Sequence, residues 1–249
     1  MKLDTQTIRS MKGKEPIAML TAYTCPIARY LEKSGVPIIL VGDTVGMVEM
    51  GFNSTCHVTM DHMQYHVAAV RRGATHTHII GDLPYQSYES PEFALSNARL
   101  LLEAGADSVK LEGPHIEEIE HLVANDVAVV GHTGLTPQTA VNFKQVGNEA
   151  ADAKRIMDEA HQIAAAGAFL MVLEHIPANL GQSITESIEI PTIGIGAGPA
   201  CDGQVLVVND ALGIGDYWPS FSKQYAQIGE IIQQAVARFK AEVVNREFP

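Results

Sequence analysis

Short apolar runs recur along the whole chain, each ending at glycine, proline or a charged residue and followed by helical spacing. The clearest, residues 36–46 (VPIILVGDTVG), describes a strand covered on both faces that stops at Asp43. The other expected strands are residues 17–23, 78–83, 108–113, 127–130, 169–173, 191–195 and 204–208. Helices are expected at residues 26–33, 61–73, 91–104, 149–166 and 223–244, with a short helix before the first strand. Residues 47–59 are expected to form a long loop, and Asp61 is expected to cap the helix that follows.

Eight strand-then-helix units without a linker predict one α/β domain over residues 1–249, a (β/α)8 TIM barrel with a short N-terminal helix. The length of 249 residues fits, because about 250 residues is usual for this barrel. A doubly wound sheet is the alternative, since it also alternates strands and helices.

Composition narrows the partners and the compartment. A net charge of −12, from 17 basic and 29 acidic residues, disfavours a nucleic-acid surface. No apolar run reaches the roughly 18 residues that a membrane span needs, and the first residues lack the apolar centre of a secretory signal. Three widely spaced cysteines, Cys25, Cys56 and Cys201, suggest reduced thiols. We therefore expect a cytoplasmic protein without nucleic-acid or membrane partners.

Ionisable side chains stand where the expected strands end. They are Asp43, Asp82, Lys110, Glu112, His132 and Glu174. Because the carboxyl ends of barrel strands meet at one mouth, these groups are predicted to converge there. Side chains alternate along a strand, so Lys110 and Glu112 share a face and are expected to point toward the barrel axis. A structural ion pair inside the barrel is the alternative for these two.

Three carboxylates at one mouth repel one another unless a cation holds them, and oxygen ligands favour Mg²⁺ over zinc. The competing interpretation is that each aspartate only caps the next turn or helix. The sequence His76-Thr77-His78 resembles a zinc pair but precedes its strand, so we expect it at the opposite end and not at a metal site. Glycines 194, 196 and 198 are interpreted as a tight turn, with a phosphate cradle as the alternative.

Several stretches match a known family in order along nearly the whole chain. They include Val41-Gly42-Asp43-Thr44, Asp82-Leu83-Pro84, Val109-Lys110-Leu111-Glu112-Gly113, Gly134-Leu135-Thr136-Pro137-Gln138, Val172-Leu173-Glu174 and Asp202-Gly203-Gln204-Val205-Leu206-Val207. Together they resemble ketopantoate hydroxymethyltransferase, a family of pantothenate biosynthesis.

The resemblance implies a barrel of the phosphoenolpyruvate-mutase kind, one Mg²⁺ per subunit and a homo-oligomer, commonly a decamer in bacterial members. It also implies a reaction in which 5,10-methylenetetrahydrofolate, 3-methyl-2-oxobutanoate and water give tetrahydrofolate and 2-dehydropantoate. By resemblance, Asp43, Asp82 and Glu112 serve the metal. Asp43, Thr44, Asp82 and Lys110 would contact the oxo acid, and Glu174 would be the proton acceptor.

The chain departs from the family pattern at a few positions. Thr44 stands where serine is usual, Thr24 replaces a common aspartate, and Asn209 a common histidine. The loop at residues 141–147 is shorter than the family's version. Two other functions therefore stay open: a Mg²⁺-dependent lyase or decarboxylase of 2-oxo acids, and a catalytically silent barrel subunit.

Overall fold

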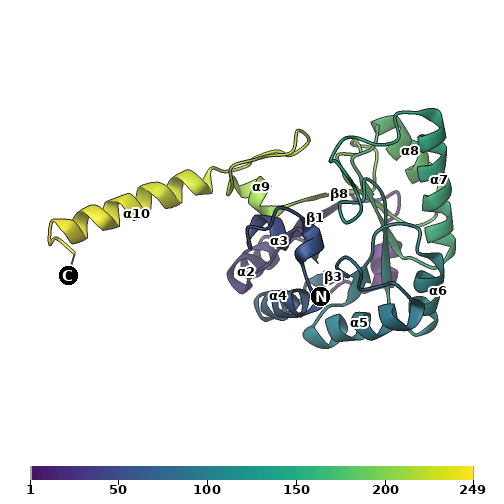
Figure 1. The fold of residues 1–249 in the computed structure, drawn as a ribbon, viewed down its shortest axis with the longest axis horizontal. Helices are drawn as coiled ribbons and strands as arrows, with labels where there is room; N and C mark the ends of the chain where they lie inside the picture. The colour runs from purple at the N-terminus through teal and green to yellow at the C-terminus, as the bar shows by residue number, and fades with distance from the viewer. Residues whose placement is uncertain (1, 249) are drawn as a thin grey trace. The chain divides into compact units, whose positions relative to one another are not determined.

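A computed structural model describes residues 2–248. Within them, eight parallel strands follow one another in sequence order and close into a barrel (Figure 1). The strands are β1 (Ile17–Thr21), β2 (Ile38–Val41), β3 (His78–Asp82), β4 (Ser108–Lys110), β5 (Val129–Gly134), β6 (Leu170–Glu174), β7 (Thr192–Ile195) and β8 (Gly203–Leu206). The predicted (β/α)8 class is confirmed, and the closed order excludes a doubly wound sheet.

Alternate residues of the strands form the apolar core of the barrel. The core includes Met19, Ile38, Leu40, Ile80, Val130, Leu170, Val172, Ile193 and Val205. The fully buried Ile8 of α1 (Thr5–Arg9) packs into the same core. His78, the first residue of β3, contacts the carbonyl of Leu3, so the predicted N-terminal helix lies at the end where the strands begin.

Helices separate most of the strands, as expected, but residues 196–202, between β7 and β8, form no helix. The longer ones in this part of the chain are α2 (Cys25–Lys33), α4 (Met60–Gly73), α5 (Pro91–Ala104), α6 (Ile116–Ala124), α7 (Ala150–Ala165) and α8 (Ala178–Ser187). Two shorter elements, α3 (Val45–Val48) and η1 (Thr55–His57), lie where residues 47–59 were expected to form a loop.

The start of α4 differs from the prediction. Asp61 was expected to cap this helix, but the cap is Thr59, whose hydroxyl accepts a hydrogen bond from His62 N. The His62 ring in turn accepts from Thr59 N, which makes a reciprocal capping box. Asp61 instead lies in the first turn, where its charge favours the positive end of the helix dipole.

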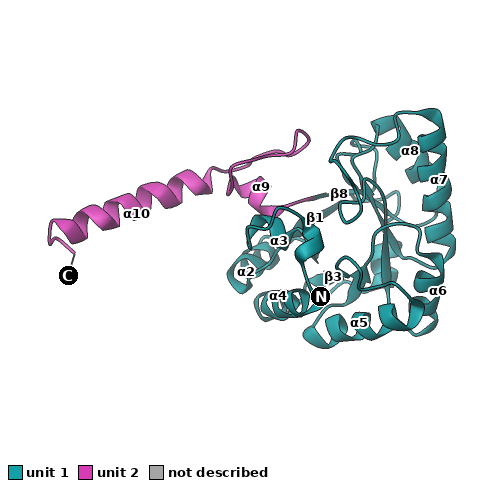
Figure 2. Cartoon of the chain, in the orientation of Figure 1, with its two compact units in different colours: residues 1–205 teal, residues 206–249 magenta. Residues whose placement is uncertain are grey.

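The chain divides into two compact units, residues 1–205 and 206–249 (Figure 2). The first holds the strands β1 to β7, the helices α1 to α8 and all of β8 except Leu206. The second contains α9 (Val208–Leu212) and α10 (Ile228–Val244), which begins later than the expected residue 223. No residue of α10 is buried. The prediction of one domain over residues 1–249 stays a prediction.

The cysteines and the apolar character of the helices were both the subject of expectations from composition. The cysteines are all free thiols, with Cys201 buried and the other two partly exposed. None of the helices within residues 2–248 has the length and apolar character that crossing a bilayer requires.

Candidate active site

The predicted side chains gather at the carboxyl ends of β2 to β6. Asp82 and Lys110 end β3 and β4, Glu174 ends β6, and Asp43 follows β2 by two residues. Asp43, Asp82, Lys110, Glu112 and His132 are each at most 5% exposed, which is unusual for charged groups. The side chain of Glu174 is more open, at 18% exposure. We call these six residues the mouth cluster.

Lys110 is the cation at the centre of the cluster. Its Nζ lies 2.8 Å from Asp82 Oδ1 and 3.9 Å from Glu112 Oε1. The backbone N–H of Asp43 donates to Asp82 Oδ2 over 3.3 Å. The prediction that Lys110 and Glu112 point to the barrel interior is therefore correct, and Asp43 and Asp82 come from neighbouring strands into contact.

The pKa values of the acids in the cluster are raised, because the acids are buried with too little positive charge beside them. Burial raises the pKa of Asp82 to about 7, although Lys110 opposes the shift. Burial also raises the pKa of Asp43 and takes that of Glu112 well above its ordinary value. Burial alone would lower the pKa of Lys110, but the carboxylates around it raise it. The lysine therefore stays charged while the acids compete for one cation.

His132 joins the two sides of the cluster. Its Nδ1 lies 3.5 Å from Lys110 Nζ and 3.6 Å from Glu112 Oε1, and its Nε2 lies 3.4 Å from Glu174 Oε2. Burial, with Lys110 beside it, lowers the pKa of His132 well below its ordinary value. The ring is thus neutral at physiological pH. Sequence reasoning placed His132 at the mouth but gave it no role.

Glu174 has the environment of a base that works near neutral pH. Burial raises the pKa of this carboxyl to about 8, with Asp43 and Asp82 adding to the effect and Lys110 opposing it. A group with a pKa near the working pH exchanges protons most effectively.

Thr44 stands beside the cluster at the start of α3. Its Oγ1 lies 2.7 Å from the hydroxyl of Tyr23, which is buried just beyond the end of β1. Burial raises the pKa of Tyr23, so the phenol stays protonated and can donate to Thr44. Sequence reasoning did not find this contact, although Tyr23 is the last residue of the first expected strand.

Gln138, from the loop after β5, was also missed as a site residue. It is 2% exposed, and its Nε2 donates to Asp43 Oδ2 over 2.9 Å. Its backbone N–H donates to Glu112 Oε2 over 3.0 Å. One loop residue therefore touches two of the predicted metal carboxylates. The sequence signal was its place at the end of the family-matching stretch Gly134-Leu135-Thr136-Pro137-Gln138.

The side chains of Asp43, Asp82 and Glu112 fit a hard divalent cation, because they offer carboxylate oxygens in a place with too little positive charge to balance them. Within residues 2–248, no three His, Cys, Asp or Glu side chains stand in a preassembled metal-holding arrangement. Lys110 contacts Oδ1 of Asp82, and Gln138 contacts Oδ2 of Asp43 and Oε2 of Glu112. A cation would thus bind Asp43 and Glu112 through the oxygens that Gln138 does not engage.

A cavity of about 530 Å³ opens next to the cluster. The loops after β3, β4 and β5 surround it, and its wall includes Tyr85, Tyr88, Leu135 and Glu112. Glu112 therefore belongs both to the cavity wall and to the mouth cluster. The volume is in the range of small-molecule sites, and the lining combines aromatic with polar groups.

Comparison with known proteins assigns the chain to a family. Residues 2–249 match the model of the family described as ketopantoate hydroxymethyltransferase. The chain belongs to this family. A similar protein from Syntrophus aciditrophicus, named 3-methyl-2-oxobutanoate hydroxymethyltransferase, is 49% identical, with 100% of this chain and 94% of the relative covered. A relative of the same name from a Synechocystis species is 45% identical, with 98% and 97% covered.

Solved structures agree on the fold of this family member. A 2,3-dimethylmalate lyase, described as a member of the PEP mutase/isocitrate lyase superfamily, matches with a TM-score of 0.63 at 13% identity, covering 97% of this chain and 87% of that one. A phosphoenolpyruvate phosphomutase from Streptomyces platensis matches with a TM-score of 0.65 at 13% identity, covering 98% and 88%. At such identities the likeness concerns the barrel alone.

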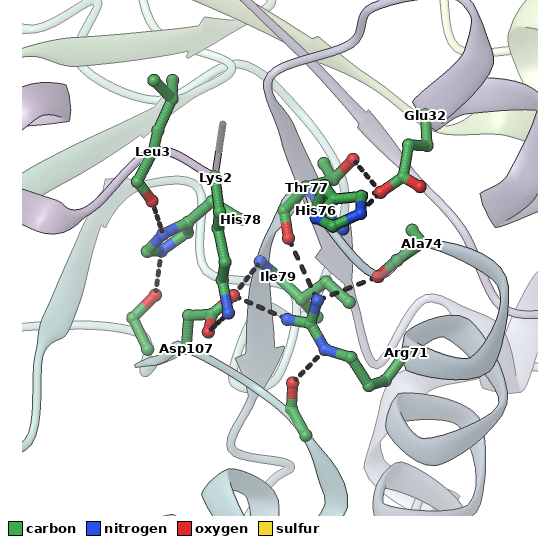
Figure 3. Close-up of polar contacts among 12 residues, drawn as sticks. Lys2, Leu3, Glu32, Arg71, Ala74, His76, Thr77, His78, Ile79 and Asp107 are labelled. Carbon is green, nitrogen blue, oxygen red and sulfur yellow. Dashed lines mark hydrogen bonds and ion pairs between the residues drawn. The ribbon is translucent and has the colours of Figure 1, made fainter.

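The His76-Thr77-His78 stretch of this hydroxymethyltransferase family member lies at the other end of the barrel, as predicted. His76 N and Thr77 N donate to Glu32 Oε2, and the ring of His78 contacts Leu3 O and Ser108 Oγ (Figure 3). These contacts tie the N-terminal segment and α2 to the start of β3.

Arg71 completes this basal network. Its guanidinium donates to Asp107 Oδ2 over 2.6 Å and to the carbonyls of Ala74, Thr77 and Gly105 (Figure 3). Lys2 pairs with the same aspartate. We call Glu32, Arg71, His78 and Asp107 with their partners the basal network.

The glycines after β7 support the predicted tight turn. Gly196 and Gly198 have φ values of 63° and 84°, which residues other than glycine rarely adopt. A Cβ on Gly198 would lie 2.4 Å from Ala178 Cβ, so the turn packs directly against the start of α8.

Proposed function

We propose that the chain transfers a hydroxymethyl group from 5,10-methylenetetrahydrofolate to 3-methyl-2-oxobutanoate and forms 2-dehydropantoate. The observation that carries the proposal is the mouth cluster, which has a buried cation, three acids beside it and a separate carboxyl suited to proton transfer. Relatives of 43–49% identity that bear this enzyme's name favour it over the lyase or decarboxylase alternative.

The oxo acid would bind against Asp43, Thr44, Asp82 and Lys110. The ammonium of Lys110, held in place by Asp82, gives a fixed positive charge for the keto oxygen as it becomes an enolate oxygen. The hydroxyl of Tyr23 contacts that of Thr44 and so limits the directions in which the Thr44 hydroxyl can point. We assign these four residues to substrate binding.

Asp43, Asp82 and Glu112 would hold one Mg²⁺. When bound, the ion would supply charge that orients a 2-oxo acid and lowers the free energy of its enolate. The pKa values of these acids are raised by burial, which means that ionising them together is costly unless a cation is present.

Glu174 would remove the proton from C3 of the oxo acid. It is the most exposed acid of the cluster, and it comes from β6, away from β2 and β3. The Nε2 atom of His132 lies 3.4 Å from Oε2 of Glu174. Water would release the one-carbon unit as formaldehyde by replacing its two C–N bonds, which leaves tetrahydrofolate. The carbanion would then add to the formaldehyde carbon, and the new alkoxide oxygen, which comes from that water, would take the proton back from Glu174.

The folate needs an opening beside the cluster because it is too large for the buried mouth. We place its pterin ring in the cavity that shares Glu112 with the cluster. Tyr85, 38% exposed at this cavity, offers a flat face for a ring. Replacing Tyr85 with alanine should raise KM for the folate and leave KM for the oxo acid unchanged. An equal change in both constants would contradict this placement.

We also propose a cytoplasmic homo-oligomer. Ile232, Val236, Phe239 and Val243 recur at helical spacing on α10, and all are largely exposed. Exposed apolar stripes of this kind usually mark an interface between proteins. Light scattering after gel filtration should give a mass of several 26.9 kDa subunits, and a monomer would contradict the proposal.

The activity is tested by incubating the protein with both substrates, with and without MgCl₂, and measuring 2-dehydropantoate by mass spectrometry. Product is expected only when the divalent cation is present. Absence of product under both conditions would contradict the proposed function and would favour the silent-barrel alternative.

A further inference from the structure

Both side-chain polar atoms of Gln138 and its backbone N–H have hydrogen-bond partners. Nε2 donates to Asp43 Oδ2 and, over 3.0 Å, to Leu83 O, while Oε1 accepts from the hydroxyl of Tyr88. The backbone N–H donates to Glu112 Oε2. The residue therefore links the ends of β2, β3 and β4 from a loop that follows β5.

These partners fix which way the amide points. Asp43 Oδ2 and Leu83 O are acceptors, so the NH₂ group must face them. The phenol of Tyr88 donates to the opposite atom, Oε1. Burial raises the pKa of Tyr88 and keeps this hydroxyl protonated. A flipped amide would set Oε1 against a carboxylate and lose all of these hydrogen bonds.

We propose that Gln138 is a positioning residue that holds the carboxylates of Asp43 and Glu112 so that one oxygen of each faces a shared divalent cation. Gln138 engages only Oδ2 of Asp43 and Oε2 of Glu112. The other oxygen of Glu112, Oε1, faces Lys110 and His132 in the mouth cluster. Tyr88 acts one step further out by orienting the amide. The inference rests on the proposed function.

The fold of the loop does not itself require this side chain. Residues 136–140 form a turn through backbone hydrogen bonds from Thr139 and Ala140 to the carbonyl of Thr136. The turn directs Gln138 back toward the barrel, where an apolar side chain of similar size would fill the same volume. Neutral N–H donors to metal-binding carboxylates set their orientation, and their loss typically lowers metal affinity about 10–100-fold.

The test replaces Gln138 with methionine, which keeps the length and removes the amide. The matched control is Gln145→Met, at an exposed glutamine in the same loop. Mn²⁺ serves as the probe, and its binding is measured by electron paramagnetic resonance in the absence of substrates. We expect Q138M to bind Mn²⁺ about 10–100-fold more weakly than Q145M. KM for the oxo acid should rise with it, and the melting temperature should fall below that of the control because Leu83 O and the Tyr88 hydroxyl lose their partner.

A second variant keeps the test decisive if Q138M does not fold. Tyr88→Phe retains the ring and loses only the hydroxyl that orients the amide, and Tyr65→Phe, at an exposed tyrosine of α4, is its control. Loss of one hydrogen bond of about 1 kcal/mol predicts a roughly fivefold weaker Mn²⁺ affinity for Y88F.

The contradicting results are separable. Unchanged Mn²⁺ affinity in Q138M or in folded Y88F, with or without a lower melting temperature, would overturn the positioning role while leaving the proposed function intact. Wild-type protein that binds no Mn²⁺ and makes no product would overturn the proposed function, and the positioning role with it.

Discussion

Carboxylates at the two ends of the barrel have pKa shifts of opposite sign. At the N-terminal ends of the strands, Glu32 receives hydrogen bonds from two backbone N–H groups and from the Thr77 hydroxyl (Figure 3). These bonds outweigh partial burial and lower its pKa. At the mouth, Asp82 and Glu174 are enclosed with other acids, and burial raises their pKa values to about 7 and about 8.

The difference separates stability from function. The basal network satisfies its charges with fixed partners, so it strengthens the fold. The mouth cluster leaves acids with too little positive charge, and such an arrangement disfavours the folded protein unless a ligand is bound. Changes at the mouth should therefore affect turnover, and changes at the base should affect unfolding.

The largest effect is expected from Glu174→Gln. The amide keeps the shape but cannot accept a proton from carbon, so kcat should fall by about 10²–10⁴-fold. Asp82→Asn should likewise lose most activity, because it removes the negative charge nearest to Lys110 and one of the proposed metal carboxylates. Steady-state kinetics with both substrates measure the loss, and Glu120→Gln, at an exposed residue of α6, is the control. Normal turnover in E174Q would remove Glu174 as the proton acceptor.

Arg71→Met should show the reverse pattern. It removes the hydrogen bonds to Asp107 and to the carbonyls of Ala74, Thr77 and Gly105. The free energy of unfolding is expected to fall by about 2–3 kcal/mol, with kcat/KM within about twofold of wild type. Urea denaturation measures the loss, and Arg72→Met, at its exposed neighbour, is the control. A stable but inactive R71M would contradict the division between the two ends.

A smaller effect is expected from the pH dependence of stability, measured without metal. The pKa of Glu174 is about 8, against an ordinary value of 4.5. The protonated carboxyl therefore stabilises the folded wild-type protein below pH 4.5, and this stabilisation is lost as the pH rises from about 4.5 to about 8. E174Q cannot ionise, so its stability relative to wild type should increase over that range by more than about 1 kcal/mol.

Glu32→Gln should respond with the opposite sign. Because the pKa of Glu32 is lowered in the folded protein, its ionised carboxyl stabilises wild type at pH values above the ordinary pKa of 4.5. This stabilisation is lost as the pH falls through the folded-state pKa. The advantage of wild type over E32Q should therefore shrink toward acid pH. Denaturation curves at several pH values compare the two variants, and parallel pH profiles for both would show that the two ends do not differ electrostatically.

The sequence predicted the fold and the six residues of the mouth cluster because both depend on short-range patterns. Continuous apolar runs marked the strands, and the alternation of Lys110 and Glu112 placed both inside the barrel. The fifth strand was expected at residues 127–130 but spans Val129–Gly134, since its polar end is buried rather than exposed. The cap of α4 was misplaced because Thr59 and Asp61 are both good caps, and only the packed structure selects one.

The contacts of Gln138, Tyr88 and His132 could not be predicted in the same way. Gln138 and Asp43 are 95 residues apart, and Gln138 and Tyr88 are 50 apart. Such pairs are brought together by barrel closure and by the path of a loop, neither of which leaves a periodic pattern in the sequence.

The central claim is that acids from separate strands share one cation that holds the oxo acid. Calorimetric titration of 3-methyl-2-oxobutanoate into the protein, with and without MgCl₂, tests it most directly, with D82N as the comparison. We expect binding to wild type only when Mg²⁺ is present, and none to D82N under either condition. Equal binding with and without the ion, or undiminished binding to D82N, would contradict the claim.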